Sequence, residues 1–278
     1  MYCSLSRSVF SLLILSLLAA CNNHGGSTTE TIDPSVDNSP RALDFTVMKL
    51  LPHDTAAFTE GLLFHDGQLY ESTGTDSDMP EDRKSLFGIV DTTTGKIRPK
   101  VELDRKKYFG EGIAFIDGKV YQLTYKTKVG FVYDANTFKK LGEFTFPSTE
   151  GWGMTTNGVD LIMSDGTSNI SYLTPGTFRL AKTLPVTDNN GPVGNVNELE
   201  LVGGYIYANQ WQTNYILKID TVSGKVVGRA NLDALVTEAR NKFAGSDVLN
   251  GIAYNPASGL FYVTGKLWPD IYEIRLSQ

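Results

Sequence analysis

Short apolar runs joined by turn residues recur from about Leu43 to the end of the chain. In each copy an apolar run meets a turn, and a second, alternating run follows it. The turns contain Asp-Gly, Asn-Gly or Gly-Gly, which two-residue hairpins favour because these residues accept positive φ at low cost. The pattern therefore predicts one β-hairpin per copy. The copies are EGLLFHDGQLYESTG from Glu60, EGIAFIDGKVYQLTY from Glu111, EGWGMTTNGVDLIMSDGT from Glu150, NELELVGGYIYANQW from Asn197 and NGIAYNPASGLFYVTGKLW from Asn250.

The distance between successive copies predicts the architecture. The steps between equivalent positions are 51, 39, 48 and 52 residues, close to the period of four-stranded propeller blades. A third and a fourth apolar run follow the hairpin in most copies, as four strands per blade require. We therefore predict an all-β fold, a five-bladed β-propeller. The positions taken as equivalent are Glu60, Glu111, Glu150, Glu198 and Asn250.

The last copy lacks a fourth strand, because it stops after DIYEIRL, just before Gln278. The segment from Leu43 to Leu51 alternates like the fourth strands elsewhere and precedes the first copy. Pairing it with the last copy closes the ring and removes two sheet edges. The predicted propeller domain is therefore 43–278, closed by its N-terminal strand. The one strong helix signal inside it is Asp233, expected as the N-cap of ALVTEARNKF.

The N-terminal segment is typical of a targeting signal. Arg7 precedes an apolar run from Val9 to Ala20, which is too short to span a bilayer and suits a signal-peptide core. The run ends in Leu-Ala-Ala-Cys, which resembles the lipobox of bacterial lipoproteins, with Cys21 as the lipidated first residue. An ordinary cleaved signal with an incidental cysteine is the alternative. We predict a lipoprotein signal peptide over residues 1–20.

Residues 21–42 are expected to be the lipidated cysteine and a flexible tether. They contain almost no apolar residues and are rich in Ser, Thr, Asn, Gly and Pro, so they cannot bury a core. Asn22, rather than Asp, follows the cysteine, which resembles lipoproteins sorted to the outer membrane. The expected location is the bacterial cell envelope, at the outer membrane or in the periplasm, with a lipid anchor as the membrane contact.

Composition and charge exclude several classes of function. The 278 residues carry 25 Lys and Arg against 31 Asp and Glu, a formal net charge of −6, so the surface is not suited to phosphates and no nucleic-acid partner is expected. The three His and two Cys are scattered without a ligand motif, so no zinc site or other Cys/His metal site is expected. Catalysis must then use carboxylates, lysines, hydroxyls or aromatic side chains.

In a propeller, equivalent positions of the repeats become neighbours in space. The first strand of each blade lines the central channel, so the repeat glutamates are expected at one end of it. Neighbouring buried carboxylates cannot all ionise easily, so at least one pKa should rise, which suits a general acid or base near neutrality. The alternative, above all for Glu150 and Glu198, is that these side chains only accept hydrogen bonds from backbone amides of the next blade.

Aromatic residues occupy comparable places beside these glutamates. Their ordinary role in a propeller is the core between blades, but five of them at one end of the channel indicate an aromatic-walled pocket. Lys266 is the one basic residue among the motifs, and it either balances the carboxylates or contacts a substrate. The five aromatic residues are Phe58, Phe109, Trp152, Trp211 and Trp268.

Nine blocks, in order over residues 44–276, together resemble the plant-type and bacterial glutaminyl-peptide cyclotransferases, also called glutaminyl cyclases. Nine ordered blocks make chance agreement remote. The blocks are FTEGL from Phe58, ESTG from Glu71, FGEG from Phe109, EGWG from Glu150, SDGT from Ser164, NELE from Asn197, ANQWQT from Ala208, LNGIA from Leu249 and VTGKLWP from Val263.

The resemblance implies a propeller aminoacyltransferase that needs no zinc. Its substrates are peptides and proteins with N-terminal glutamine, which it converts to 5-oxoproline (pyroglutamate) with release of ammonia. Glu111, in the FGEG block, is implied to be the proton shuttle, and Glu60 is a second catalytic carboxylate where plant members carry glutamine. No cofactor is required, although some members hold a structural calcium ion in the channel. The residues implied to bind substrate are Phe58, Phe109, Trp152, Asn197, Trp211 and Lys266.

Two alternatives come from other classes of protein. A propeller lipoprotein could bind peptides at the same aromatic mouth without chemistry, since a fold does not fix function. A calcium-dependent, lactonase-like hydrolase could use Glu60, Asn197 and Asp247 as ligands, although the nine blocks do not fit that group. No coiled coil or exposed apolar stripe predicts an oligomer, so a monomer is expected.

Overall fold

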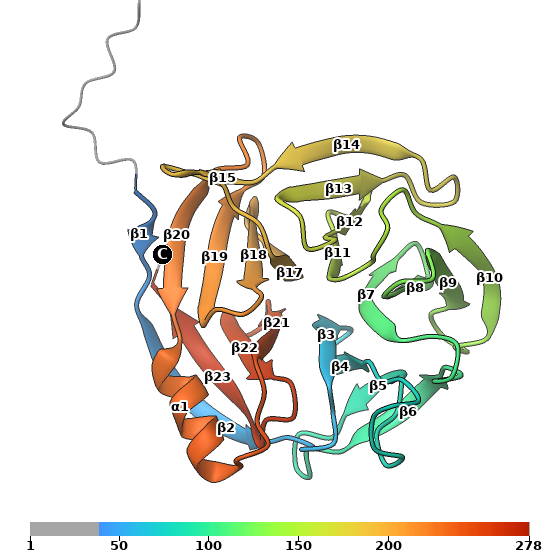
Figure 1. The fold of residues 1–278 in the computed structure, drawn as a ribbon, viewed down its shortest axis with the longest axis horizontal. Coiled ribbons are helices and arrows are strands. Elements are labelled where there is room, and N and C mark those ends of the chain that lie inside the picture. Colours follow the sequence, from blue (N-terminus) through green and yellow to red (C-terminus); the bar gives the residue numbers. More distant parts are fainter. Residues whose placement is uncertain (1–38, 278) are drawn as a thin grey trace, which may run out of the picture. The chain divides into compact units, whose positions relative to one another are not determined.

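The computed structural model describes residues 39–277, which form five sheets arranged as a ring around a common axis (Figure 1). The inner strand of each sheet contacts the inner strands on either side of it. This confirms the predicted five-bladed β-propeller. The predicted signal peptide, Cys21 and most of the predicted tether lie outside the described residues. The inner strands are β3 (Thr59–His65), β7 (Gly110–Ile116), β11 (Met154–Thr156), β17 (Val196–Val202) and β21 (Leu249–Asn255).

Each inner strand is followed by three outer ones. Blade one continues with β4 (Gln68–Thr73), β5 (Leu86–Val90) and β6 (Ile97–Glu102), and blade two with β8 (Lys119–Thr124), β9 (Val129–Asp134) and β10 (Lys140–Thr145). Blade three adds β12 (Leu161–Met163), β13 (Asn169–Leu173) and β14 (Leu180–Pro185), and blade four adds β18 (Tyr205–Gln210), β19 (Tyr215–Asp220) and β20 (Val226–Asn231). A small ribbon between these two blades consists of β15 (Thr187–Asp188) and β16 (Gly191–Pro192).

The N-terminal strand closes the ring. Blade five consists of β21, β22 (Leu260–Gly265), β23 (Asp270–Leu276) and β2 (Phe45–Pro52), so its outermost strand comes from the other end of the propeller. β2 pairs antiparallel with β23 along its whole length, from Phe45 opposite Leu276 to Pro52 opposite Asp270. The predicted closure is confirmed, because the edge that β23 would otherwise expose is covered.

The predicted tether ends earlier than residue 42. Arg41 and Ala42 form β1 (Arg41–Ala42), which pairs in parallel with Gly228 and Arg229 of β20. The backbone N–H of Leu43 then donates to the carbonyl of Arg229 at 2.9 Å. The composition of this segment is polar, but β-sheet pairing uses the backbone, so the edge of blade four can order residues that have no apolar side chain to bury.

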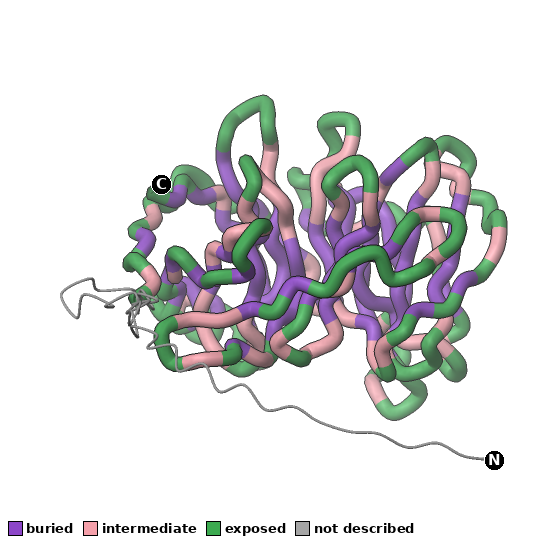
Figure 2. The backbone as a smooth tube through the Cα atoms, turned by 90° about the horizontal axis from the view of Figure 1, so that it is seen from above, coloured by how far each residue is buried: buried purple, intermediate pink, exposed green. Residues whose placement is uncertain are grey.

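The hairpin turns follow the predicted chemistry. Asp66 and Gly67 have φ of 48° and 72°, and Asp117 and Gly118 have φ of 51° and 67°, the positive values that a two-residue turn requires. All four residues are exposed, and Figure 2 shows in general that loops at the surface are green and strand interiors are purple. The turns therefore lie at the surface, and the strand interiors supply the core.

The strand register corrects the alignment of the copies. In blade two a β-bulge interrupts the pairing of β7 with β8 at Glu111, and similar irregularities lie in blades one, four and five. Counted from the matching pairs, the residue equivalent to Glu111 is Trp152 in blade three and Asn197 in blade four, not Glu150 and Glu198. Matching the copies on their glutamates therefore misplaces blade three by two residues and blade four by one.

Apolar side chains fill the spaces between neighbouring blades. One of these clusters lies between blades four and five, and α1 (Asp233–Lys242) covers it with three buried residues. The N-cap of this helix is Leu232, whereas Asp233, predicted to be the cap, is its first residue and accepts hydrogen bonds from Asn214 and Asn231. Within residues 39–277 no helix has the length and apolar content to cross a membrane.

Candidate active site

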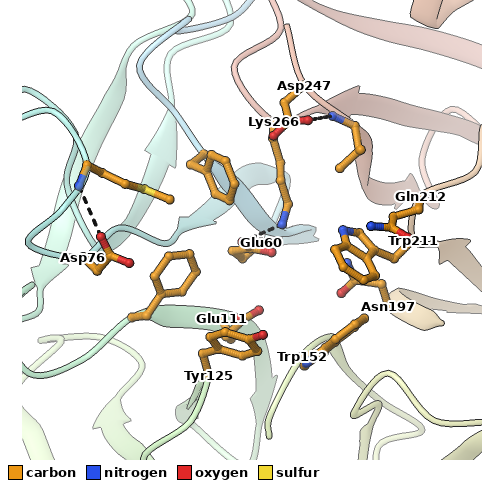
Figure 3. Close-up of a pocket in the computed structure, with 14 residues that line it drawn as sticks. Glu60, Asp76, Glu111, Tyr125, Trp152, Asn197, Trp211, Gln212, Asp247 and Lys266 are labelled. Atoms are coloured by element: carbon orange, nitrogen blue, oxygen red, sulfur yellow. Dashed lines mark hydrogen bonds and ion pairs between the residues drawn. The ribbon is translucent and has the colours of Figure 1, made fainter.

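A pocket of about 360 Å³ opens at the end of the ring where the inner strands begin (Figure 3). The start of each inner strand and the end of its antiparallel neighbour lie at the same end, so all five blades contribute. The residues at the starts of inner strands are Phe58, Glu60, Phe109, Glu111, Trp152, Asn197, Asp247 and Val248, and those after second strands are Asp76, Met79, Tyr125, Trp211, Gln212 and Lys266.

All eight residues that the sequence assigned to catalysis or substrate binding line this pocket. Asp247, considered only as a ligand of the alternative hydrolase, lines it as well. The sequence analysis missed Asp76, Met79, Tyr125, Gln212 and Val248, because the loops that carry them have no shared motif. Tyr125 carried a usable signal, since it directly follows the second strand of its blade, as Trp211 and Lys266 do.

Glu60 is held as the partner of a cation. Its side chain is almost fully buried, Oε1 lies 2.7 Å from Nζ of Lys266, and Oε2 accepts a hydrogen bond from Nδ2 of Asn250 at 3.3 Å. Burial raises the pKa of Glu60, while the charge and hydrogen bond of Lys266 lower it, and the net pKa lies above the ordinary value. The cation therefore offsets much of the cost of an ionised Glu60.

Glu111 lies beside Glu60 and has no cation of its own. The two carboxyl groups are within hydrogen-bonding reach, and that contact lowers the pKa of Glu60 and raises the pKa of Glu111. Burial, followed by the negative charge of Glu60, raises the pKa of Glu111 well above its ordinary value. Of the two carboxyl groups, Glu111 is therefore the one whose protonated form is favoured more strongly, while Lys266 favours the ionised form of Glu60.

Five aromatic rings line the pocket: four of the predicted ones and Tyr125. Trp152 and Trp211 meet edge to face with centroids 5.4 Å apart, and Phe58 and Phe109 do so at 6.1 Å. Nζ of Lys266 lies 4.5 Å from the centroid of the Phe58 ring, which adds a cation–π contact to its ion pair. Behind these walls both carboxyl groups are buried, which strengthens the electrostatic interactions between them.

The fifth predicted aromatic, Trp268, is a core residue instead. Its side chain is fully buried, packs edge to face on Tyr272, and donates from Nε1 to the carbonyl of Asp247. A Cβ on Gly265 would lie 2.2 Å from the Trp268 ring, so only glycine permits this close approach. Trp268 therefore supports the Lys266 turn from behind and does not line the pocket.

Glu198 and Glu150, the two glutamates wrongly matched with Glu111, support the surrounding structure and do not line the pocket. Glu198 is buried near the axis and accepts backbone N–H groups of Leu62 and Ile252 at 3.2 and 2.8 Å, as the alternative interpretation expected. Glu150 lies at the rim, where Oε2 accepts the Nε1 hydrogen of Trp152 at 2.9 Å. Glu198 therefore joins blades, and Glu150 orients a pocket wall.

A buried His–Glu pair braces the site between blades five and one. Nε2 of His53 lies 3.0 Å from Oε1 of Glu71, and Nδ1 of His53 donates to the carbonyl of Trp268 at 2.7 Å. Burial lowers the pKa of His53, but the charge and hydrogen bond of Glu71 raise it, and the net shift is upward. Thr59, next to Glu60, also donates to Glu71. The pair thus ties the turn after Lys266 to the strand that bears Glu60.

Asn197 presents an unused acceptor in the same pocket. Its side chain is 3% exposed, and Oδ1 has no hydrogen-bond donor among residues 39–277. Its backbone carbonyl is fixed by the hydroxyl of Ser164 at 2.6 Å. A buried acceptor without a donor is costly, so a ligand that brings an N–H group to Asn197 is favoured.

The described residues offer little to a metal ion. Among them no group of three or more His, Cys, Asp or Glu side chains is placed to hold one, and Glu60, a ligand in the alternative hydrolase, is bound to Lys266. Oδ1 of Asn250, like that of Asn197, is buried without a donor and is the kind of oxygen that calcium accepts. The channel calcium stays a prediction, with these two oxygens as its available side-chain ligands.

The fold and the site together define a class of protein: a five-bladed propeller with two neighbouring carboxyl groups in an aromatic pocket at one end of its channel. The sequence profile described as glutamine cyclotransferase matches residues 14–276. The chain belongs to this family.

Two relatives agree with this assignment. The glutaminyl-peptide cyclotransferase of Arabidopsis thaliana is 35% identical over 285 residues, covering 99% of this chain and 86% of the relative. The crystal structure of Myxococcus xanthus glutaminyl cyclase superposes with a TM-score of 0.76 at 32% identity, covering 86% of this chain and 98% of that one. The resemblance stated from nine sequence blocks is confirmed.

Proposed function

We propose that this protein is a glutaminyl-peptide cyclotransferase that converts the N-terminal glutaminyl residue of peptides and proteins to 5-oxoproline, with Glu111 carrying the proton. The observation that supports it most is the Glu60–Glu111 pair, two neighbouring buried carboxyl groups with raised pKa values inside an aromatic pocket. Membership of the glutamine cyclotransferase family indicates which reaction this pair serves, the cyclisation of glutamine. It also favours an enzyme over a peptide-binding propeller without chemistry.

The reaction requires one proton to pass between two nitrogen atoms of the same residue. The α-amino nitrogen attacks the carbon of its own γ-carboxamide, a new C–N bond forms, and the amine gives up a proton. The old C–N bond breaks when its nitrogen accepts a proton, and ammonia departs. The α-amino group has a pKa of about 8, so a useful fraction is neutral and nucleophilic near neutral pH.

Glu111 is placed to move that proton. Because burial and the charge of Glu60 raise its pKa and so favour its protonated form, Glu111 is proposed to donate to the leaving nitrogen and to receive the proton of the attacking amine in return. Glu60 stays ionised against Lys266 and accepts the hydrogen bond of Glu111. The charge of the pair is therefore the same before and after the reaction.

The rest of the pocket positions the substrate and holds developing charge. Ring closure within one residue needs a folded side chain, and a tight aromatic wall favours that conformer. Nε1 of Trp152 is already bound to Glu150, and Nζ of Lys266 to Glu60. Nε1 of Trp211 and Nδ2 of Asn197 donate to no other atom of residues 39–277, so they are the donors for the carboxamide oxygen.

The direct test is incubation of the purified protein with Gln-Ala-Ala, with and without a chelator. We expect ammonia release and a peptide lighter by one ammonia in both, because no cofactor takes part in the proton transfer. An intact peptide would indicate a binding protein. Loss of the reaction with chelator would indicate a metal-dependent site and contradict the proposal.

We also propose that the enzyme is anchored in a bacterial cell envelope through a lipid on Cys21. The Leu-Ala-Ala-Cys block and the polar segment after it support this proposal. Cys21→Ser should abolish labelling by a fatty-acid probe and leave the protein soluble or unprocessed. Labelling that persists in the variant would contradict the lipid anchor, whatever its enzymatic activity.

A further inference from the structure

The inference concerns the mouth of the pocket, through which the rest of a peptide substrate must leave. The glutaminyl residue lies against Glu111 and the aromatic walls, so its carbonyl leads residue two of the peptide toward solvent. Two carboxylates, Asp76 and Asp247, line this pocket from blades one and five, and both residues are exposed. Figure 3 shows them on different sides of the opening.

These two carboxylates have no cationic partner among residues 39–277. Oδ1 of Asp76 accepts the backbone N–H groups of Asp78 and Met79, at 3.0 and 3.2 Å, and Oδ1 of Asp247 accepts the N–H of Val248 at 2.8 Å. These bonds fix the orientation of each carboxylate and leave its negative charge uncompensated.

The nearby cations are engaged elsewhere. Nζ of Lys266 is bound to Glu60 at 2.7 Å. Lys126, at the Tyr125 side of the pocket, lies 4.4 Å from the centroid of that ring and pairs with Glu150 at 3.7 Å. The field at the mouth is therefore negative, and the negative charge of Asp247 extends to Glu60, whose pKa it raises.

The loop that carries Asp76 is held in place by an arginine that does not neutralise it. The guanidinium of Arg105 donates to the backbone carbonyl oxygens of Asp76, Met79, Pro80 and Arg83. Hydrogen bonds to carbonyls fix the loop while the carboxylate of Asp76 remains available. The site is thus organised before a substrate arrives, which lowers the entropic cost of using it.

A second feature of this pocket calls for a polar ligand. Oδ1 of Asn197, buried and without a donor, gains a partner when the N–H groups of an entering peptide reach it. Met79 and Val248, beside the two carboxylates, supply apolar surface for the methylene groups of a long side chain.

We propose that Asp76 and Asp247, with Met79 and Val248, form a subsite for a cationic side chain, lysine or arginine, at residue two of the substrate. The inference rests on the proposed function and names the substrates that this site prefers. A side chain of this kind places its stem on the apolar surface and its charge between the two carboxylates.

The test compares three tripeptides, Gln-Lys-Ala, Gln-(acetyl-Lys)-Ala and Gln-Glu-Ala, by their kcat/KM values. Acetylation keeps the length of the lysine stem and removes only its charge, so we expect Gln-Lys-Ala to exceed its acetylated form about two- to fivefold, mainly through a lower KM. Gln-Glu-Ala should be the poorest. The preference should shrink as salt is added, because the mouth is exposed and its charges are screened.

Asp76→Asn and Asp247→Asn keep the oxygen that accepts the backbone N–H groups and remove the charge. Each should bring the ratio of Gln-Lys-Ala to its acetylated form closer to one. Asp82→Asn makes the same change on the same loop, away from the pocket, and should retain the wild-type ratio. A wild-type ratio of one, or a ratio that neither pocket substitution alters, would overturn the subsite. Absence of cyclisation with all three peptides would instead overturn the proposed function, and the subsite with it.

Discussion

Glu60 and Glu111 are the same residue type in the same pocket, and one cation distinguishes them. Lys266 lies 2.7 Å from Glu60 and so favours its ionised form, while Glu111 meets burial and the charge of its neighbour. The same pocket therefore favours the ionised form of one carboxyl group and the protonated form of the other, and the proposed mechanism uses them as charge holder and proton carrier. Each assignment can be tested by one substitution.

Glu111→Gln should lower turnover strongly. The amide keeps the size and hydrogen-bonding reach of the side chain but cannot carry the proton, so kcat on a glutaminyl peptide should fall by roughly 10²- to 10⁴-fold, with a far smaller change in KM. Glu143→Gln, the same change at an exposed pair with Lys140, is the matched control and should retain wild-type kinetics. Near wild-type turnover of Glu111→Gln from about pH 6 to 9 would exclude Glu111 as the shuttle and make Glu60 the candidate.

Lys266→Met should make a carboxyl group harder to ionise. Lys266 lowers the pKa of Glu60, so its removal raises that pKa further, and a protonated carboxyl band in the infrared spectrum should persist to higher pH than in the wild type. The additional band should be absent from the Glu60→Gln/Lys266→Met double variant. Identical titrations of the wild type and Lys266→Met would show that the lysine does not control Glu60.

At the scale of strands, the β-bulge determines which side chains enter the pocket. Glu111 and Asn197 lie at bulges and line the pocket, Trp152 lines it from the equivalent position of blade three, and in blade two the next residue is Gly112. A Cβ there would lie 2.4 Å from the backbone nitrogen of Met154 in the next inner strand. The glycine therefore allows neighbouring blades to approach closely enough for their bulge residues to share one pocket.

Gly112→Ala should destabilise the propeller, because the obstacle is backbone that cannot rotate away. We expect a loss of about 1–3 kcal/mol in the free energy of unfolding, measured by denaturant titration. Gly142→Ala is the matched control, since it lies in outer strand β10 with no atom within 4 Å of an added Cβ. Equal stability of both variants would show that the close approach is not required.

At the scale of the whole molecule, the ring depends on a strand from the far end of the chain. β2 pairs with β23 over its full length, while the preceding β1 contributes only two residue pairs to β20. Closure therefore depends far more on β2 than on β1.

A truncation series separates these contributions. Deleting residues 22–38 should leave the melting temperature unchanged, and deleting 22–42 should lower it slightly through the loss of β1. Deleting 22–51 removes most of β2 and exposes two edges, so that protein should unfold or aggregate. Equal melting of the longest and shortest deletions would show that β2 does not close the ring.

The sequence by itself determined the hairpins, the number of blades and the closing strand. These follow from turn dipeptides, alternating apolar positions and a missing fourth strand, which are local patterns with a fixed period. It also placed Glu60, Glu111 and Lys266 in one site, because equivalent positions of a closed ring converge on its axis.

Only the tertiary structure decided the alignment of blades three and four and the different environments of the glutamates. The copies were matched on their glutamates, whereas the pairing of inner and second strands makes Trp152 and Asn197, rather than Glu150 and Glu198, equivalent to Glu111. Contrary to the prediction from the sequence, Trp268 does not line the pocket, because its ring packs on Gly265. The spacing of residues along the chain does not reveal such a contact. The pKa of each carboxyl group follows from burial and from charges on other blades, and these distances exist only after the ring has closed.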